Sequence, residues 1–210
     1  QVGEILVTCR DLNLVVNLSL DGVGAEHDDI RGVHGNYEAL LDAYERLRRI
    51  SFEFPNLQVG LHTVISKYNI RSIPKIYEAV AKLAPHSFIT EIAEERTELF
   101  NVASGVSPSP RDFAEATRLL SKRIREKSLK QNSSRLTQSF RLVYYELAER
   151  TMRERRQIVP CYAGFASCQI TPYGDVWPCC VLGYSMPLGS LRQVDYVLEK
   201  VWNSPRADQI

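Results

Sequence analysis

Four of the five cysteines lie within the twenty residues from Cys161 to Cys180, which read CYAGFASCQITPYGDVWPCC. Pro172, Tyr173 and Gly174 form a predicted turn inside this stretch, where backbone amides can point at a sulfur-rich centre. Thiols at this density indicate a disulfide scaffold, a zinc site or an iron–sulfur site. Each of these restricts how the surrounding chain can fold.

The spacing of the cysteines helps to distinguish the three kinds of site. Disulfide frameworks belong to small secreted domains with an even number of cysteines, whereas this chain has 210 residues and five cysteines. Structural zinc prefers thiolates separated by roughly two to four residues, and here the gaps are six, ten and zero residues. An iron–sulfur cluster is larger than one ion and accepts ligands from more distant positions. The spacing favours an iron–sulfur site, with zinc as the alternative.

Within this stretch, Cys161, Cys168 and Cys179 are the predicted cluster ligands. If the segment before Cys180 is extended, adjacent side chains point to opposite faces, so Cys179 and Cys180 would not easily share one cluster. The fourth ligand is therefore open between Cys180, a residue outside these 210 and a site left free for substrate. The remaining cysteine, Cys9, lies in the short apolar run 5–9, which is either a strand or the end of a helix, and is predicted to be a small buried hydrophobic residue.

The rest of the chain alternates between strand and helix patterns. Ser109 is a predicted N-cap, followed by Pro110 at the first helical position and by the capping acid Asp112. Alternating strands and helices without hairpin turns imply a parallel sheet covered by helices, either open or closed as a barrel. The predicted strands are 12–20, 57–66 and 87–91, and the predicted helices start near residues 36, 73, 110 and 135, with Asn36 as the N-cap of the first. Phe113 and Leu120 belong to the predicted apolar stripe of the third helix, and Leu136 and Phe140 belong to that of the fourth.

Composition excludes several classes of protein. The 26 basic and 25 acidic side chains nearly cancel, which argues against a general nucleic-acid-binding protein. With 44% hydrophobic and 24% charged residues the chain resembles an average soluble globular protein. No apolar run approaches the roughly 18 residues of a membrane span. We expect a cytoplasmic protein with no nucleic-acid or membrane partner.

Ligands of parallel sheets bind at the carboxyl ends of the strands. The segments 19–22 and 66–69 and the residue Glu91 follow or end predicted strands, so we expect them to face a common site. Glu91 is a predicted substrate contact. Taken alone, the segment after Asp21 is also typical of a helix-capping loop, in which His27 would be a solvated loop histidine.

Two parts of the chain resemble one known family. The pattern of Cys161, twelve residues, Gly174, four residues and Cys179 is similar to the start of the SPASM/twitch domain of radical S-adenosylmethionine enzymes. The tail PLGSLRQVDYVLEKVWNSPRA, residues 187–207, resembles the same domain. A complete SPASM domain continues with Cys-x2-Cys-x5-Cys-x3-Cys and a final cysteine, and these residues do not contain that continuation.

The segment SLDGVGAEHDDIRGVHGNYEALLDA, residues 19–43, is similar to the fourth strand and helix of the radical S-adenosylmethionine barrel. The resemblance implies a partial (β/α) TIM-type barrel followed by a small cysteine-rich domain. It also implies that Ser19 lies beside the ribose of S-adenosylmethionine and that Arg31 meets the cofactor's carboxylate. Asp21 belongs to the same motif, so we predict Ser19, Asp21 and Arg31 as cofactor-binding residues.

The family's reducing cluster is held by Cys-x3-Cys-x2-Cys, and that motif does not occur in these 210 residues. Because the chain starts at Gln1 and also lacks the first barrel strands, we expect the motif upstream in a longer parent and this segment alone to be inactive. The resemblance implies an oxidoreductase-type enzyme that modifies a peptide or protein through a 5′-deoxyadenosyl radical. It also implies an auxiliary 4Fe-4S cluster and an electron donor such as flavodoxin or ferredoxin.

The predicted domain division has three parts. Residues 1–107 form the C-terminal part of the barrel, residues 108–158 form a helical linker, and residues 159–210 form the truncated SPASM/twitch-like iron–sulfur domain. The alternative function is a non-catalytic interaction module that binds zinc or one iron–sulfur cluster for folding or partner docking.

Overall fold

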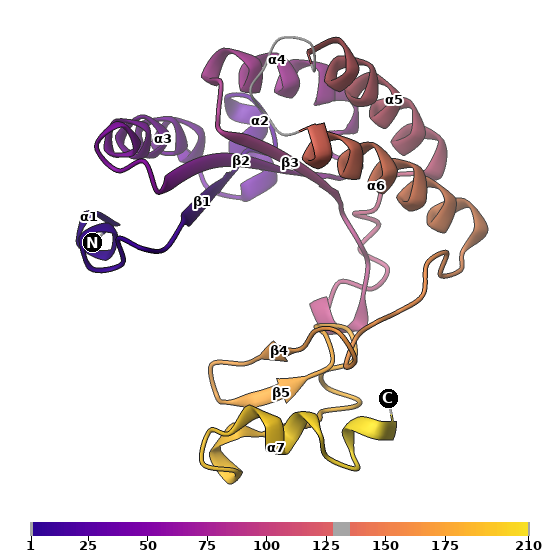
Figure 1. Cartoon of the computed structure of the whole chain (residues 1–210). Coiled ribbons are helices and arrows are strands. Elements are labelled where there is room, and N and C mark those ends of the chain that lie inside the picture. The colour runs from indigo at the N-terminus through magenta and orange to yellow at the C-terminus, as the bar shows by residue number, and fades with distance from the viewer. Residues whose placement is uncertain (1, 128–134, 210) are drawn as a thin grey trace. The chain divides into compact units, whose positions relative to one another are not determined.

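The computed structural model describes residues 2–127 and 135–209, and the chain forms two compact units (Figure 1). The first unit contains the described residues up to Glu94 and from Gly105 to Arg156. The second contains residues 95–104 and the described residues from Gln157 onward. The region predicted as a helical linker thus belongs largely to the first unit, while the predicted domain boundaries stay a prediction.

The first unit is built on three parallel strands in the order β1 (Leu14–Ser19), β2 (Leu57–Ile65) and β3 (Ser87–Ile92). Two helices, α2 (Ala25–Arg31) and α3 (Asn36–Glu53), connect β1 to β2. The short 3-10 helix η1 (Ile70–Ser72) and α4 (Ile73–Leu83) connect β2 to β3. Each connection returns the chain to the same end of the sheet, as parallel strands require.

One face of this sheet is covered and the other is not. In β2, Leu57, Val59, Leu61 and Ile65 are at most 2% exposed and pack into one core with residues of α3, α4 and the later helices. Figure 1 shows these helices on one side of the strands. On the opposite face Val15 is 50% exposed. This exposed face corresponds to the interior of a complete (β/α) barrel.

The N-terminal residues form the helix α1 (Val2–Thr8), whose Leu6 is buried in the same core. The sequence left open whether residues 5–9 were a strand or the end of a helix, and the structure makes them mostly helical. Cys9 follows this helix and is half-buried.

Helix α5 (Pro110–Lys127) begins as the sequence predicts. The N–H of Asp112 donates to Oγ of Ser109 at 3.1 Å, and that hydroxyl donates to the Asp112 carboxylate at 2.7 Å. Phe113 and Leu120 are buried on the predicted face of the helix. The capping prediction and the apolar stripe are therefore confirmed.

Helix α6 (Arg135–Glu154) packs on α5 with a different face from the one its sequence predicts. Leu136 and Phe140 were expected on the buried face, but they are 65% and 67% exposed. Tyr145 is buried instead, and its hydroxyl hydrogen-bonds Oγ1 of Thr90 in β3. The neighbouring Tyr144 hydroxyl accepts the N–H of Ile92 at 3.1 Å. These contacts to β3 set the rotation of the helix.

The second unit contains a small antiparallel sheet of β4 (Gln169–Ile170), β5 (Asp175–Trp177) and β6 (Gly189–Ser190). Its core consists of Val176, Leu188, Leu191 and Val201, the last from helix α7 (Leu198–Trp202). Three short 3-10 helices complete the described elements: η2 (Thr97–Leu99) and η4 (Ala207–Gln209) in this unit, and η3 (Leu191–Gln193) directly after β6. None of the described helices is long and apolar enough to cross a membrane.

Candidate functional site

The predicted site residues of the first unit lie at the carboxyl ends of its strands. Ser19 is the last residue of β1 and pairs with His62 of β2. Glu91 of β3 pairs with Val64 of β2. Side chains alternate along a strand, and the β2 residues between and beside these partners are buried against the helices. Ser19, His62 and Glu91 therefore point to the uncovered face.

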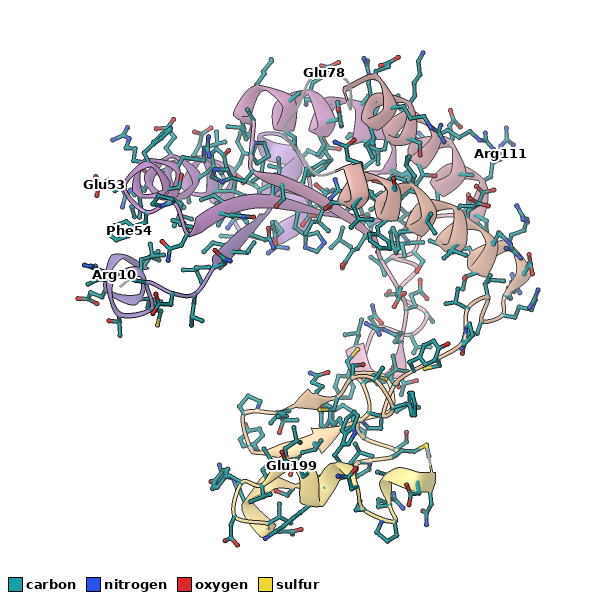
Figure 2. All side chains as sticks on the ribbon, viewed as in Figure 1. Arg10, Glu53, Phe54, Glu78, Arg111 and Glu199 are labelled. Atoms are coloured by element: carbon teal, nitrogen blue, oxygen red, sulfur yellow. The ribbon has the colours of Figure 1, made fainter. Side chains whose placement is uncertain are left out.

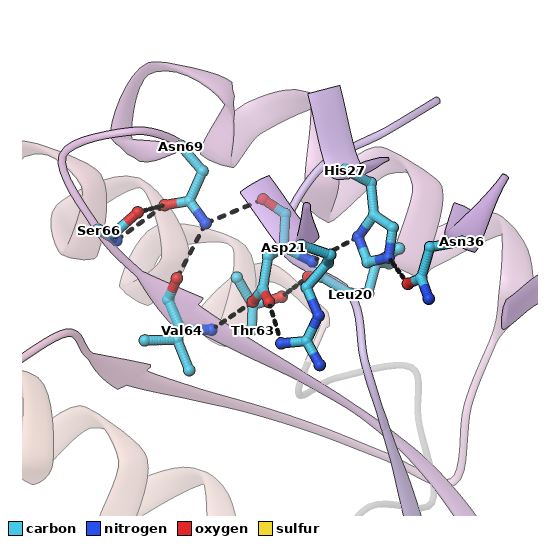
Figure 3. A network of polar contacts seen from close by, with 9 residues as sticks. Leu20, Asp21, His27, Asn36, Thr63, Val64, Ser66 and Asn69 are labelled. Atoms are coloured by element: carbon cyan, nitrogen blue, oxygen red, sulfur yellow. Dashed lines mark hydrogen bonds and ion pairs between the residues drawn. The ribbon is translucent and has the colours of Figure 1, made fainter. Parts of the chain in front are cut away.

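Asp21 organises the loop that follows β1 (Figure 3). It is only 3% exposed. Its Oδ1 accepts the N–H of Val64 at 2.8 Å, and its Oδ2 accepts Nη1 of Arg31 at 3.1 Å. Arg31 remains 42% exposed in its side chain. Both oxygens of the Asp21 carboxylate thus accept hydrogen bonds from other residues of the protein. The guanidinium of Arg31 is still partly exposed to solvent.

The loop after β2 is tied to the same point. Nδ2 of Asn69 donates to the carbonyl oxygens of Asp21 and Val64, each at 2.9 Å, while its Oδ1 accepts the N–H of Ser66 at 2.8 Å. Asn69 is 1% exposed, and Figure 3 shows its amide between the two loops. Because buried polar groups are costly unless they are hydrogen-bonded, this network holds the ends of β1 and β2 in one arrangement.

The sequence interpretation of His27 as a solvated loop residue is wrong. His27 is fully buried. Its Nδ1 accepts the N–H of Asp21 at 3.1 Å, so Nδ1 carries no proton, and its Nε2 lies 2.8 Å from Oδ1 of Asn36. These partners assign the neutral tautomer with the proton on Nε2. His27 is a structural part of the Asp21 loop.

The predicted N-cap of α3, Asn36, also has a different role. The helix begins at Asn36 with Gly35 as its N-cap, and the side chain of Asn36 turns to His27. The carboxylate of Asp28 accepts the N–H groups of Tyr37 at 2.7 Å and of Gly35 at 2.6 Å. The bond from Tyr37 is the main cause that lowers the pKa of Asp28. A carboxylate from α2 therefore stabilises the start of α3.

His62 is a residue that the sequence analysis missed. Its Nε2 lies 3.4 Å from Oε2 of Glu91 across neighbouring strands, with 26% and 59% of the two side chains exposed. The alternation of β2 could have identified it, because His62 is a polar residue between the buried Leu61 and Thr63. Such a residue must lie on the face away from the helices.

A cavity of about 740 Å³ lies elsewhere in the first unit, near the start of β2 and β3. Leu57, His86, Arg141 and Tyr145 are among its lining residues. Burial lowers the pKa of Arg141 and raises that of Tyr145. None of the predicted site residues lines this cavity, which opens at the edge of the sheet opposite to Ser19.

In the second unit, backbone pairing brings Cys168 close to Cys179 at one end of a hairpin. A tight loop with a bridge between Ala163 and Ser167 joins Cys161 to Cys168. Cys168 directly precedes β4, and the β4–β5 register continues to place it opposite Pro178, next to Cys179. Gly174 has a φ of 87° in the connecting turn, a conformation that favours glycine.

Two of the thiols accept hydrogen bonds. The N–H of Leu182 donates to Sγ of Cys179 at 3.4 Å, and Nη1 of Arg96 donates to Sγ of Cys180 at 3.6 Å. Hydrogen bonds to the ligand sulfurs tune a bound iron–sulfur cluster. Cys161 and Cys180 are exposed, while Cys168 and Cys179 are half-buried.

Free thiols from separated positions in the second unit are compatible with an iron–sulfur cluster. All five cysteines are free thiols, so no disulfide is present among the described residues. Within residues 2–127 and 135–209, no three His, Cys, Asp or Glu side chains converge closely enough to hold a single metal ion. A ready-made tetrahedral zinc site is therefore not part of the described structure. A cluster of iron and sulfide is larger than one ion, so its thiolate ligands can come from positions that lie further apart.

Residues 161–210 match the family model of SPASM, an iron–sulfur cluster-binding domain. No curated protein sequence is similar enough to match this chain.

The whole chain is similar in fold to solved structures of anSMEcpe. For native anSMEcpe with bound AdoMet (S-adenosylmethionine), the TM-score is 0.64 at 16% identity, with 99% of this chain and 55% of that chain covered. For native anSMEcpe with bound AdoMet and Kp18Cys peptide, the TM-score is 0.59 at 15% identity, with 94% and 52% covered. The chain thus spans little more than half the length of these solved chains.

The two comparisons confirm the resemblance predicted from the sequence. Residues 161–210 carry the SPASM domain. The first unit, with its parallel sheet and helices, has the predicted fold of a partial barrel. The fold class is therefore confirmed, whereas the individual site residues stay predictions.

Proposed function

We propose that this chain is the barrel and auxiliary-cluster portion of a radical S-adenosylmethionine enzyme that modifies a peptide or protein side chain. The observation that carries the proposal is the match of residues 161–210 to an iron–sulfur cluster-binding domain, combined with a parallel sheet that has Ser19 and Glu91 at or near the carboxyl ends of its strands. Neither the family match nor the parallel sheet by itself would assign this function.

The proposed cluster ligands are Cys161, Cys168 and Cys179, with Cys180 as the candidate for a fourth. The N–H of Leu182 supports Cys179 by donating to its sulfur. Arg96 likewise donates to the sulfur of Cys180. These donors are part of the second unit and would surround a 4Fe-4S cluster there.

The proposed cofactor site lies at the carboxyl end of β1. Ser19 presents its hydroxyl on the uncovered face, where it would contact a ribose. Arg31 would meet a carboxylate, because its guanidinium is exposed and fixed in place. Asp21 contributes by holding Arg31 rather than by touching the ligand, since its oxygens already accept two hydrogen bonds.

When bound and reduced by one electron, S-adenosylmethionine supplies the 5′-deoxyadenosyl radical that abstracts a hydrogen atom from the substrate. The reduction would need the Cys-x3-Cys-x2-Cys motif that these 210 residues do not contain. The residues described here would instead bind and orient cofactor and substrate. Glu91 lies two residues further along the sheet than the pair of Ser19 and His62 and is the proposed substrate contact.

The proposed substrate is a peptide, which is supported by the peptide bound in one of the solved structures of similar fold. An electron donor such as flavodoxin or ferredoxin and a cytoplasmic location belong to the same proposal. The near-neutral balance of charges supports neither nucleic acid nor a membrane as a partner.

Anaerobic reconstitution with ferrous iron and sulfide tests the proposal. We expect a brown protein with broad visible absorption and about four iron atoms per cluster. Exchange of Cys161, Cys168 and Cys179 for alanine should abolish iron uptake, because each exchange removes a thiolate ligand. Cys9→Ala is the matched control and should leave iron uptake unchanged, since Cys9 lies in the other unit.

A colourless protein with stoichiometric zinc would favour the alternative, a metal-binding interaction module. Iron uptake that survives the loss of all three cysteines would contradict the ligand assignment. The single variant Cys180→Ala separates the two possibilities for the fourth ligand. It lowers iron content if Cys180 binds the cluster and leaves it unchanged if it does not.

A further inference from the structure

His62 and Glu91 place two polar atoms next to each other on the uncovered face of the sheet. Nε2 of His62 lies 3.4 Å from Oε2 of Glu91. This separation exceeds the usual N–H···O distance of roughly 2.7–3.2 Å, and Nε2 is buried without a hydrogen-bond partner in the described part of the chain. The pair therefore leaves hydrogen-bonding capacity unused.

The charge around this pair is negative. Among the described residues, the one ion-pair partner of Glu91 is His62, and no lysine or arginine neutralises the carboxylate. The pKa of Tyr144 is raised, mainly by burial and further by the charges of Glu91 and Glu94. The exposed carboxylate of Glu91 therefore attracts a cation and repels an anion.

We propose that His62 and Glu91 recognise a cationic side chain of the peptide substrate, a lysine ammonium or an arginine guanidinium. Both groups carry several N–H donors and no acceptor. Oε2 of Glu91, whose side chain is 59% exposed, can accept a hydrogen bond from such a cation, and the ring of His62 lies against this carboxylate. A carboxylate at this position would face Glu91 and be disfavoured.

The pair of His62 and Glu91 lies next to the proposed cofactor site at Ser19. His62 pairs in register with Ser19, and neighbouring strands lie about 4.8 Å apart. A cation held by His62 and Glu91 would therefore lie beside the proposed nucleoside position at Ser19. This inference rests on the proposed function and adds a substrate class to it: peptides with a basic residue at the position that enters the barrel.

Binding of three labelled peptides to the reconstituted full chain tests the inference. The peptides share one sequence and differ at one position, which is lysine, glutamine or glutamate. We expect the lysine peptide to bind at least about tenfold more tightly than the glutamate peptide by fluorescence anisotropy, as a charge-assisted hydrogen bond would provide. Glu91→Gln should remove most of this preference, and Glu91→Lys should reverse it.

Glu78→Gln is the matched control. Glu78 is an exposed glutamate on α4, and Figure 2 labels it on the helix-covered side of the sheet. Its exchange removes the same charge from the chain, so an effect of net charge alone would appear in both variants. His62→Phe should weaken binding of the lysine peptide more than that of the glutamine peptide.

Wild-type protein that binds the three peptides equally, or binds none of them, overturns the inference. An undiminished preference in Glu91→Gln overturns it as well. A chain that takes up iron and sulfide but shows no charge preference refutes the recognition site alone. A charge preference in a chain that takes up no iron refutes the proposed function alone.

Discussion

The carboxylate of Asp21 holds the guanidinium of Arg31 at 3.1 Å, although 5% of the first side chain and 42% of the second are exposed. A buried carboxylate in the loop after β1 therefore holds a guanidinium that solvent can reach. The remaining carboxylate oxygen accepts the N–H of Val64 in β2. An exposed arginine is thus fixed before any ligand arrives, which lowers the entropic cost of binding an anionic group.

Asp21→Ala should destabilise the protein by about 1–3 kcal/mol, because it leaves the N–H of Val64 without an acceptor in a buried position. Asp21→Asn should cost less, since an amide oxygen can still accept that bond. Urea unfolding followed by circular dichroism measures both. Asp29→Ala is the control, because Asp29 is exposed. Equal losses for the Asp21 and Asp29 variants would argue against the network.

Gly22→Ala should destabilise the protein by about 1–3 kcal/mol through overpacking. A Cβ at this position would lie 2.6 Å from the backbone N of His27 and 2.9 Å from the backbone C of Glu26. These are main-chain atoms of α2 that cannot rotate away. At Gly3, in contrast, a Cβ meets nothing within 4 Å. Gly3→Ala in α1 should be neutral or slightly stabilising, and a thermal melt of both variants compares them.

Asp28→Asn should destabilise the protein at pH 7 but much less in acid. The pKa of Asp28 is lowered below its ordinary value of 3.8 by the N–H groups of Tyr37 and Gly35. A lowered pKa in the folded state means that the ionised form contributes stability above pH 3.8, and that this contribution is lost as the pH falls through the lower folded value. The urea midpoints of wild type and variant should therefore converge below about pH 4. A constant difference across pH would contradict the capping role.

Ser109→Ala should cost about 1 kcal/mol, the usual effect of losing a helix N-cap. The N–H of Asp112 loses its acceptor in this variant. Ser109→Asp keeps an acceptor at the same place, although it also puts a second carboxylate beside Asp112, so it should restore part of the stability. Guanidinium unfolding of the three proteins provides the comparison. A Ser109→Asp variant that is no more stable than Ser109→Ala would show that the hydroxyl has no capping role.

Local rules explain what could be predicted from the sequence. The cap at Ser109 and the buried face of α5 depend on neighbours within one helix, and both occur as predicted. The strands of the parallel sheet also follow from alternation and branched side chains. Cysteine spacing indicated the iron–sulfur domain, because the spacing of ligands reflects the size of the bound centre.

The errors arose where distant residues decide the outcome. Leu136 and Phe140 fit the apolar stripe of α6, but the hydroxyls of Tyr144 and Tyr145 find partners on β3 and rotate that stripe outward. His27 has no apolar pattern around it, so nothing local indicates that its ring fills the space under Asp21. Glu91 was predicted from its place at a strand end, whereas His62 lies inside a strand, where only the alternation of β2 points to it.

The hydrogen bond from the N–H of Ile92 to the hydroxyl of Tyr144 limits where a further strand can pair with the sheet. It occupies a main-chain donor on the outer margin of β3, where an added strand would have to pair. Further strands of a barrel would therefore join beside Leu14–Ser19, the opposite margin. On the β3 side, an added strand would first have to displace the hydroxyl of Tyr144 from this donor.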